Sequence, residues 1–332
     1  MTAGATYDVV GIGNAIVDVI ARGEDDFLVA HGLHKGGMAL IDEAKSSALY
    51  EAMGSATIMS GGSAANTMVG VASLGGKAAF VGKVRDDEPG HAFRHDIAAA
   101  GVHFPTTPAT DGASTARCLV VVTPDGERTM STYLGACIGL GPEDVEDKLI
   151  AEAQILYFEG YLWDPPRAKE AFRKGAAAAR KAGRRTALTL SDSFCVDRYR
   201  DEFLDLIRNG LVDILFANES ELHALYQTAD FDTAVRALAD EKTLGFVTRS
   251  AEGCAIVNGG VVEYTPAAPI AELVDTTGAG DLFAAGVLFG LARGLPLRRC
   301  AGIGALAAAE IIQHYGARPE ISLAELVAQT PA

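Results

Sequence analysis

This sequence of 332 residues lacks closely spaced cysteine pairs, a net positive charge and long apolar runs. Its five cysteines include no C-x-x-C pair, so neither a zinc site nor a redox motif is expected, and a reducing compartment fits best. The formal net charge of −15 argues against a nucleic-acid-binding surface, which requires a basic face. Because no apolar run is long enough for a membrane span or an export signal, we expect a soluble, cytoplasmic protein.

Two common catalytic patterns are absent as well. The sequence has neither a Ser-His-Asp order nor a Cys-His pairing, so acyl transfer is not expected. The segment Gly11-Ile-Gly13-Asn14 begins like a dinucleotide-binding fingerprint, but Ile16 stands where that fingerprint needs glycine or alanine, which disfavours NAD binding. There remain Asn14 and Asp18, polar groups suited to paired hydroxyls or, alternatively, ordinary turn and cap residues.

Short β-rich runs alternate with Ala-rich helical runs along most of the chain. This alternation is typical of an α/β fold, in which a doubly wound, mostly parallel sheet carries helices on both faces. We treat residues 1–332 as a single domain. The expected strands are 8–12, 78–82, 155–158, 186–190, 214–217, 245–248 and 254–258, and the expected helices are 64–74, 90–100, 166–182, 198–209, 220–226, 232–240, 281–292 and 297–315.

Two segments interrupt this alternation, at approximately 15–45 and 105–135. The runs 115–123 and 127–133, joined through Pro124-Asp125-Gly126, predict a β-hairpin, whereas 16–41 reads as extended chain with turns. The two segments can pair into a small separate sheet. Such a lid would cover the carboxyl edge of the main sheet, where doubly wound folds bind ligands.

The stretch from Asp275 to Asp281 (DTTGAGD) carries the strongest functional signal, because an apolar helix follows it at once. The first amides of a helix have no partner inside it and attract an anion, so a phosphate could settle beside the Asp281 carboxylate. We expect that carboxylate to stay ionised near neutral pH and to accept a proton from a hydroxyl, which suggests phosphoryl transfer to an alcohol. Alternatively, Gly278 and Gly280 only form a tight turn and Asp281 only caps the helix.

Two further motifs follow strands and open helices. In Gly61-Gly62-Ser-Ala-Ala-Asn66, the glycines let the backbone approach a ligand and Asn66 can offer its amide to a hydroxyl, although a plain strand-to-helix loop uses similar residues. Asn218 and Glu221 lie three apart on the first turn of a predicted helix. Their oxygens suit Mg²⁺, and the alternative is a capping box. The turn from Thr248 to Gly253 either contacts a nucleotide or is an ordinary β-turn.

Taken in order, these motifs resemble the ribokinase, or PfkB, family of carbohydrate and nucleoside kinases over nearly the whole chain. Within that family, several stretches are most similar to the adenosine kinases, among them Gly13-Asn14-Ala-Ile-Val-Asp18, residues 128–137 and Leu190-Ser191-Asp192. The resemblance implies a ribokinase-like fold with a β-sheet lid. One departure is Ser250, which stands where the family's T-x-G-x-x-G turn has glycine.

The resemblance also assigns roles to individual residues. It implies Asp281 as the base, Gly278, Ala279 and Gly280 as the anion hole, and Arg128 as a group that reaches the phosphates on closure. The implied substrate contacts are Asn14, Asp18, Gly61, Gly62, Asn66 and Thr277 on the sugar side and Cys118, Met130, Leu134 and Tyr161 around the base. The implied cofactor contacts are Asn218, Thr248, Arg249, Gly253, Thr276, Gly278 and Gly280, with Asn218 and Glu221 near Mg²⁺.

The activity implied by the resemblance is ATP- and Mg²⁺-dependent phosphorylation of the 5′-hydroxyl of a ribonucleoside, with conversion of adenosine to AMP favoured. The alternative within the same chemistry is a kinase of a sugar or sugar acid, such as ribose, fructose or 2-keto-3-deoxygluconate. A binding protein without catalysis is disfavoured because the Gly-Ala-Gly-Asp281 motif is intact. Dependence on K⁺ and the choice between monomer and homodimer stay open.

Overall fold

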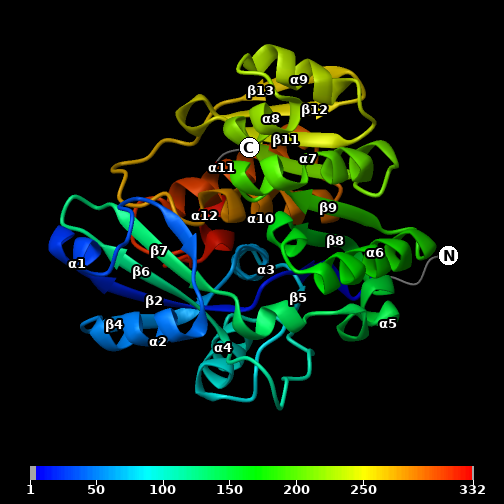
Figure 1. Ribbon diagram of the computed structural model, residues 1–332. Helices are drawn as coiled ribbons and strands as arrows, with labels where there is room; N and C mark the ends of the chain where they lie inside the picture. Colours follow the sequence, from blue (N-terminus) through cyan, green and yellow to red (C-terminus); the bar gives the residue numbers. More distant parts are fainter. Residues whose placement is uncertain (1–4, 331–332) are drawn as a thin grey trace.

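The computed structural model describes residues 5–330 and contains two β-sheets, one of eight strands and one of five (Figure 1). The large sheet has the strand order β13-β12-β11-β10-β9-β8-β1-β5. Its six parallel strands are β1 (Tyr7–Ile12), β5 (Ala78–Val81), β8 (Ala153–Glu159), β9 (Arg185–Thr189), β10 (Ile214–Asn218) and β11 (Leu244–Thr248). Two antiparallel strands, β12 (Cys254–Asn258) and β13 (Val261–Thr265), complete one edge.

Helices cover both faces of the large sheet, as the sequence predicts. Alternate residues of one strand point to opposite faces, so Val10 and Ile12 of β1 enter one apolar core while Val9 enters the other. The first core is closed by α6 (Pro166–Lys181), α7 (Ser193–Arg208), α8 (Glu219–Tyr226) and α9 (Phe231–Ala239). The second is closed by α3 (Ser63–Ser73), α4 (Glu88–Ala99), α10 (Ala279–Ala292) and α11 (Leu297–Ile311).

The small sheet is built from both segments that interrupt the βα alternation, and it also recruits one strand from outside them. Its order is β3 (Met38–Leu40), β7 (Arg128–Tyr133), β6 (Ala116–Val122), β2 (Ile16–Arg22) and β4 (Ala56–Gly61). Strands β6 and β7 form the expected antiparallel hairpin, and β4 pairs antiparallel with β2. Strand β4 ends directly before α3, so the small sheet is tied to the helix that carries Asn66.

Several element boundaries differ from the sequence prediction. Helix α7 begins at Ser193, five residues earlier than expected, because the Asp192 side chain caps it by accepting from the Cys195 amide. Residues 16–41 contain the short helix α1 (Asp25–Ala30), which buries only Leu28 and so leaves no helical pattern in the sequence.

The remaining helices are α2 (Glu43–Ala52), α5 (Asp147–Ala151) and α12 (Leu323–Gln329), with 3₁₀ turns η1 (Gly135–Gly139), η2 (Pro142–Asp144), η3 (Gly160–Trp163) and η4 (Ser250–Glu252).

The carboxyl ends of the parallel strands bring the candidate site residues to one edge of the large sheet. Glu159, Asn218 and Thr248 each end a strand of that sheet, and Asn14 follows β1 by two residues. Helix α10 begins at the same edge of the large sheet, and the small sheet lies beside that edge (Figure 1). Within residues 5–330, no helix combines the length and apolar character needed to cross a membrane.

Candidate active site

A cavity of about 780 Å³ separates the carboxyl edge of the large sheet from the small sheet. The small sheet contributes Ile16, Asp18, Met38, Cys118 and Met130 to its wall. The large sheet and its helices contribute polar groups from several distant parts of the sequence. Among them are Asn14, Glu159, Asp192, Asn218, Glu221, Thr248, Thr277 and Asp281. Residues spread across most of the chain therefore converge on one covered crevice, as expected for the ligand site of a doubly wound fold.

The start of α10 presents unpaired amides to this cavity. Gly278 adopts φ +79°, a conformation that favours glycine, and a Cβ there would lie only 2.9 Å from the Ala317 methyl group. The Ala279 amide donates to the Thr276 carbonyl at 3.2 Å, but the amides of Gly280 and Asp281 have no hydrogen-bond partner in the described part of the chain. No atom lies within 4 Å of the position that a Gly280 Cβ would take. This open helix terminus fits an anion.

The Asp281 carboxylate stands at the same helix start and lines the cavity. Its Oδ1 accepts a hydrogen bond from the Ser63 hydroxyl at 2.6 Å, and its Oδ2 accepts one from the Asn66 amide at 3.0 Å. Burial raises its pKa to about 6, while these two hydrogen bonds and the charge of Arg318 act in the opposite direction. Asp281 is therefore ionised at neutral pH, in the state that a general base requires, and becomes protonated under mildly acidic conditions.

Glu159, which the sequence analysis missed, holds the floor of the site together. This carboxylate is 1% exposed and accepts from the backbone amide and the side-chain amide of Asn14 at 2.9 and 2.8 Å. It also accepts from the Ala64 amide at the start of α3 at 2.8 Å. Asn14 is thereby fixed with its Oδ1 unpartnered. The only available sequence signal was a single charge ending the apolar run Ile155-Leu-Tyr-Phe-Glu159.

Asp18, Gly61 at the end of β4 and Gly62 before α3 form a second part of the site. Gly62 adopts φ +94°, and a Cβ there would come within 2.2 Å of the Asn14 carbonyl oxygen, so this position requires glycine. A Cβ on Gly61 would come within 2.1 Å of the Asp18 Oδ2 and would displace the Asp18 carboxylate. Burial raises the pKa of Asp18 to about 6, against the lowering effect of Arg318 and Arg128. The Asp18 carboxylate faces the cavity and is available for a ligand hydroxyl.

Asn218 and Glu221 form the capping box that the sequence allowed as the alternative to a metal site, and both line the cavity. The Glu221 amide donates to Asn218 Oδ1 at 2.8 Å, while Glu221 accepts from the backbone and side-chain amides of Asn218 at 3.0 and 2.7 Å. Glu221 is 5% exposed, and burial raises its pKa to about 7. No group of three or more His, Cys, Asp or Glu residues in the described chain could hold a metal ion. The hydrogen-bonding atoms of Asn218 and Glu221 are thus largely engaged with each other.

Three of the expected cofactor contacts lie outside the cavity wall. The Arg249 guanidinium pairs with Glu252 at 2.6 Å and lies over the Phe231 ring at 3.9 Å, while Gly253 closes the turn by accepting from the Arg249 amide. Thr276 is exposed and is not part of the lining. Of the turn that starts at Thr248, only Thr248 itself reaches the cavity.

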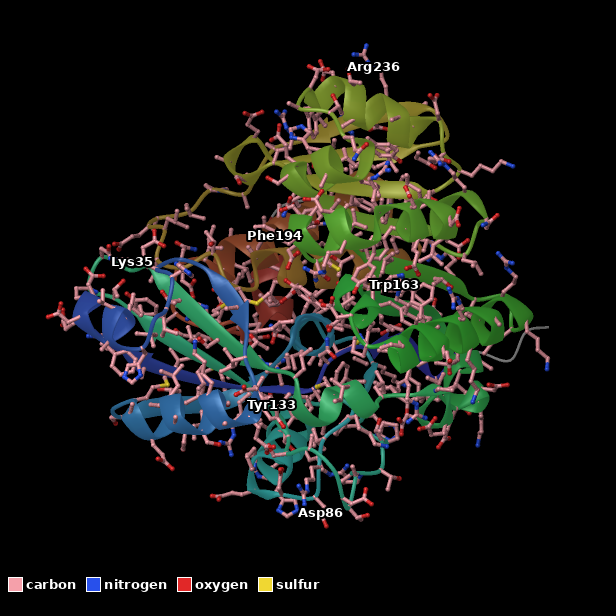
Figure 2. All side chains as sticks on the ribbon, in the orientation of Figure 1. Lys35, Asp86, Tyr133, Trp163, Phe194 and Arg236 are labelled. Atoms are coloured by element: carbon pink, nitrogen blue, oxygen red, sulfur yellow. The ribbon has the colours of Figure 1, made fainter. Side chains whose placement is uncertain are left out.

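One part of the cavity wall is mainly apolar and is lined from both the small sheet and the large-sheet side. Cys118, Met130, Leu134 and Tyr161 all line the cavity, as the sequence analysis expected of a base pocket. Burial raises the pKa of the Cys118 thiol to about 12, so this cysteine acts as a small apolar side chain. Phe194 at the start of α7 also lines the cavity and is 74% exposed, which places an aromatic ring at its rim (Figure 2).

Arg128 joins the small sheet to the loop before α10. Its Nη1 donates to the Thr277 hydroxyl at 2.6 Å and pairs with Asp275 Oδ2 at 3.0 Å. Asp275 itself accepts from the amides of Thr277 and Gly316 at 3.0 and 3.1 Å, so the carboxylate is fixed. Two donors of the same guanidinium, Nε and Nη2, are buried without a partner among residues 5–330. Buried unpaired donors are costly, so the guanidinium of Arg128 has hydrogen-bonding capacity that its present contacts do not use.

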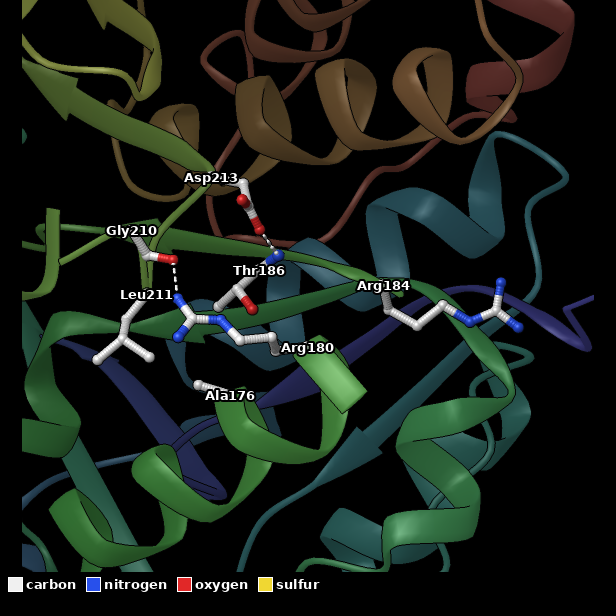
Figure 3. A pocket seen from close by; sticks show the side chains of 7 residues that line it. All are labelled: Ala176, Arg180, Arg184, Thr186, Gly210, Leu211 and Asp213. Carbon is white, nitrogen blue, oxygen red and sulfur yellow. Dashed lines mark hydrogen bonds between the residues drawn. The ribbon is translucent and has the colours of Figure 1, made fainter. Parts of the chain in front are cut away.

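A smaller cavity of about 120 Å³ lies at the opposite end of the strands, near the beginnings of β9 and β10 (Figure 3). Arg180 there donates to the Gly210 carbonyl, and the Thr186 amide donates to Asp213 at 2.7 Å. Figure 3 shows the Arg184 side chain directed away from the other lining groups. This cavity therefore lacks convergent groups for a ligand.

With this geometry established, comparison with known proteins decides the family. The model of the pfkB family of carbohydrate kinases matches residues 41–323. The chain belongs to the pfkB family. Members of this family are phosphotransferases that act on hydroxyl groups, which agrees with a carboxylate and open amides in one cavity.

Relatives of this pfkB protein include kinases of nucleosides and of sugars. The structure of adenosine kinase from Sinorhizobium meliloti is 55% identical, with 98% of this chain and 99% of that chain covered and a TM-score of 0.93. A probable sugar kinase from Rhizobium etli is 53% identical, with 98% of each chain covered and a TM-score of 0.93. Probable fructokinase-6 of Arabidopsis thaliana is 33% identical over 71% of this chain, which spans 63% of that relative's length.

The raised carboxyl pKa values predict how stability depends on pH. Burial raises the pKa to about 6 for Asp18 and Asp281 and to about 7 for Glu159 and Glu221. In this range the unfolded chain has already released protons that the folded chain retains, so the free energy of unfolding should fall as pH rises from about 4 to about 7. Urea unfolding of the free protein across this interval measures the effect.

The variant Glu221→Gln isolates one of these groups. Its glutamine cannot ionise, so any constant cost of altering the capping box stays the same at all pH values. The difference in unfolding free energy between wild type and variant should change by on the order of 1–3 kcal/mol across the interval. A difference that stays constant with pH would contradict the raised pKa of Glu221.

Proposed function

We propose that the protein is an ATP-dependent kinase that phosphorylates the 5′-hydroxyl of a ribonucleoside, with adenosine as the favoured substrate and AMP as product. The observation that carries this proposal is the position of the Asp281 carboxylate, which lies beside the unpaired amides at the start of α10 in a covered cavity. Phosphoryl transfer needs an oriented hydroxyl, a base and charge stabilisation for the moving phosphoryl group. Each of these requirements has a candidate group here.

Asp281 would take the proton of the attacking hydroxyl as that oxygen bonds to the γ-phosphorus and ADP leaves. Ser63 and Asn66 hold both of its oxygens by hydrogen bonds and so aim the carboxylate. The amides of Gly280 and Asp281 would stabilise the negative charge of the phosphoryl group. Arg128 does not line the cavity, so its two unpartnered donors would add to this stabilisation only when the small sheet closes and brings them to the phosphate oxygens, which guanidinium groups bind well.

The substrate sugar would lie against the polar part of the wall. Asp18 faces the cavity as a free acceptor, and Asn14 is fixed by Glu159 with its own carbonyl oxygen unpartnered. Two acceptors at this place suit the paired hydroxyls of a ribose. The apolar side of the wall, with Cys118, Met130, Leu134 and the exposed ring of Phe194, suits a flat base.

The residues of the cavity fit ATP and its magnesium ion. The open amides of α10 suit a phosphate. Thr248, at the end of β11, also lines the cavity, and we assign it a contact to ATP. Mg²⁺, when bound, would supply positive charge that neutralises part of the phosphate charge. Because Asn218 and Glu221 are engaged with each other, we assign them contacts to the waters of that ion rather than direct ligation.

A substrate panel tests the proposal. Purified protein with Mg-ATP is incubated separately with adenosine, inosine, ribose, fructose and 2-keto-3-deoxygluconate, and ADP release is followed. We expect the highest kcat/KM for adenosine, with the product identified as AMP by chromatography. Higher kcat/KM for a free sugar or sugar acid would overturn the nucleoside assignment, and absence of ADP release with every acceptor would overturn the kinase assignment.

A sugar or sugar-acid kinase is the second candidate, and one observation favours it. The cavity wall also contains an ion pair, in which the single nitrogen Arg198 Nη2 contacts both carboxylate oxygens of Asp164 at 2.9 and 3.1 Å. A charged pair at the wall suits a polar acceptor better than a purine. The relative from Rhizobium etli is itself described as a probable sugar kinase.

A further inference from the structure

Arg318 lies beyond the end of α11, in a part of the sequence without a recognisable motif, and is bound on all sides of its guanidinium. Its Nε donates to the Ser60 carbonyl at 3.0 Å, its Nη2 to the Ser60 hydroxyl at 2.8 Å, and its Nη1 to the Ala65 carbonyl at 3.1 Å. Ser60 is near the end of β4 in the small sheet, and Ala65 is in the first turn of α3. Arg318 therefore clamps the Gly61-Gly62 connection from both ends.

The same short segment supports the loop before α10. The Gly316 amide donates to Asp275 at 3.1 Å, and Ala317 packs directly against Gly278. Ala65, held by Arg318, directly precedes Asn66, whose amide donates to Asp281. Residues 316–318 thus contact both elements that place the carboxylate of Asp281, although they are far from it in sequence.

The charges around Asp281 are mostly negative. Burial raises the pKa of Asp18 of β2, Glu159 of β8 and Glu221 of α8, as well as that of the phenols of Tyr157 and Tyr161, and the charge of Asp281 adds a smaller contribution in the same direction to each. For Asp281 itself, burial favours the protonated form.

The positive charges on this side of the cavity come from Arg128 and Arg318. The charge of Arg318 lowers the pKa of both Asp18 and Asp281, whereas Arg128 lowers that of Asp18. Burial lowers the pKa of Arg318 itself to about 10, opposed by the charges of Asp96, Asp18 and Asp281, so the guanidinium stays charged at neutral pH. Asp96 of α4 accepts from the Ser60 amide at 2.8 Å and is thus part of the same contact.

We propose that Arg318 is a positioning residue for the reaction: by holding Ser60 and Ala65 it fixes the Ser60–Asn66 stretch that presents Asn66 to Asp281, and it places a buried positive charge on this acidic side of the site. This inference rests on the proposed role of Asp281 as a base. Arg318 itself does not line the cavity, so it acts through Asp281 and not on the substrate.

Titration of the Asp281 carboxyl group tests the inference in the free protein. Protein labelled with ¹³C at the aspartate side-chain carboxyl is titrated by NMR, and the Asp281 resonance is assigned by its loss in Asp281→Asn. In Arg318→Gln the apparent pKa of Asp281 should rise, so that at a pH below this pKa the ionised fraction of Asp281 is about tenfold lower than in wild type. In Arg318→Lys, which keeps the charge but loses the fork of hydrogen bonds, the pKa should stay close to that of wild type.

Kinetics provide the second readout. With the best acceptor from the substrate panel, Arg318→Gln should shift the acid limb of kcat/KM to higher pH and regain activity under alkaline conditions, which a purely structural role would not produce. If the glutamine variant does not fold, Arg318→Met retains the apolar stem and serves the same purpose. An unchanged Asp281 titration in the neutral variant overturns the inference. Because the titration needs no substrate, this outcome is distinct from failure of the kinase assignment.

Discussion

Replacement of Asp281 by asparagine is expected to lower kcat by about 10³-fold while both substrates still bind. Asparagine has nearly the same shape and can still accept from Ser63, but it cannot take the proton of an attacking hydroxyl. Steady-state kinetics with the best acceptor of the panel, combined with calorimetric measurement of nucleotide binding, checks both parts of this expectation. The loss should appear in kcat with little change in KM.

The stability of this variant provides a further check. Burial disfavours the charged form of Asp281, so the neutral asparagine should leave the protein at least as stable as wild type above pH 6. A matched control is Asp232→Asn, which neutralises an exposed aspartate in the first turn of α9. That control should keep full activity. Wild-type turnover in Asp281→Asn would remove the base from the mechanism.

Replacement of Arg128 by methionine should lower kcat by about 10²-fold, the usual cost of losing one donor to a charged transition state. The variant loses the contacts to Asp275 and Thr277 and the two donors that have no other partner. Because the methionine fills much of the same buried space, we expect the fold to persist. The measurement is kcat and KM for ATP and for the acceptor, together with the thermal unfolding midpoint.

Arg117→Met is the matched control for Arg128. It removes the same charge from the neighbouring strand β6, where the Arg117 guanidinium lies 5.1 Å from the centre of the Tyr50 ring and not at the loop before α10 that Arg128 contacts. This variant should retain activity within a factor of about two, since surface charges rarely affect a step that they do not contact. Equal losses in the two variants would mean that the lid responds to net charge and that Arg128 has no specific role.

The fold could be predicted from the sequence where a helix, strand or turn is determined by residues that are neighbours along the chain. Apolar runs such as 155–158 and 214–217, separated by Ala-rich helices, led directly to the parallel sheet, and Pro124-Asp125-Gly126 located the β6–β7 hairpin. Strand β4 was not recognised as part of the lid, because its pairing with β2 joins residues about forty positions apart. The short helix α1 was missed because a single buried leucine gives no periodic pattern.

The candidate site was predictable where a motif carries its own conformation. Gly278 and Gly280 predict a helix start with accessible amides. Gly61 and Gly62 leave room for the Asp18 carboxylate and the Asn14 carbonyl oxygen, where a side chain would collide with them. Glu159 and Arg318 carry no such local mark, since each acquires its role only through partners distant in sequence: Asn14 for the first, Ser60 and Ala65 for the second. Buried charge networks of this kind become visible only once the chain has folded.

The most direct test of the account is a crystal structure of the protein with Mg²⁺, a non-hydrolysable ATP analogue and the acceptor selected by the panel. We predict the acceptor hydroxyl within about 3 Å of a carboxylate oxygen of Asp281, with the terminal phosphate against the amides of Gly280 and Asp281. An acceptor hydroxyl directed away from Asp281, or a terminal phosphate bound elsewhere than the start of α10, would contradict it.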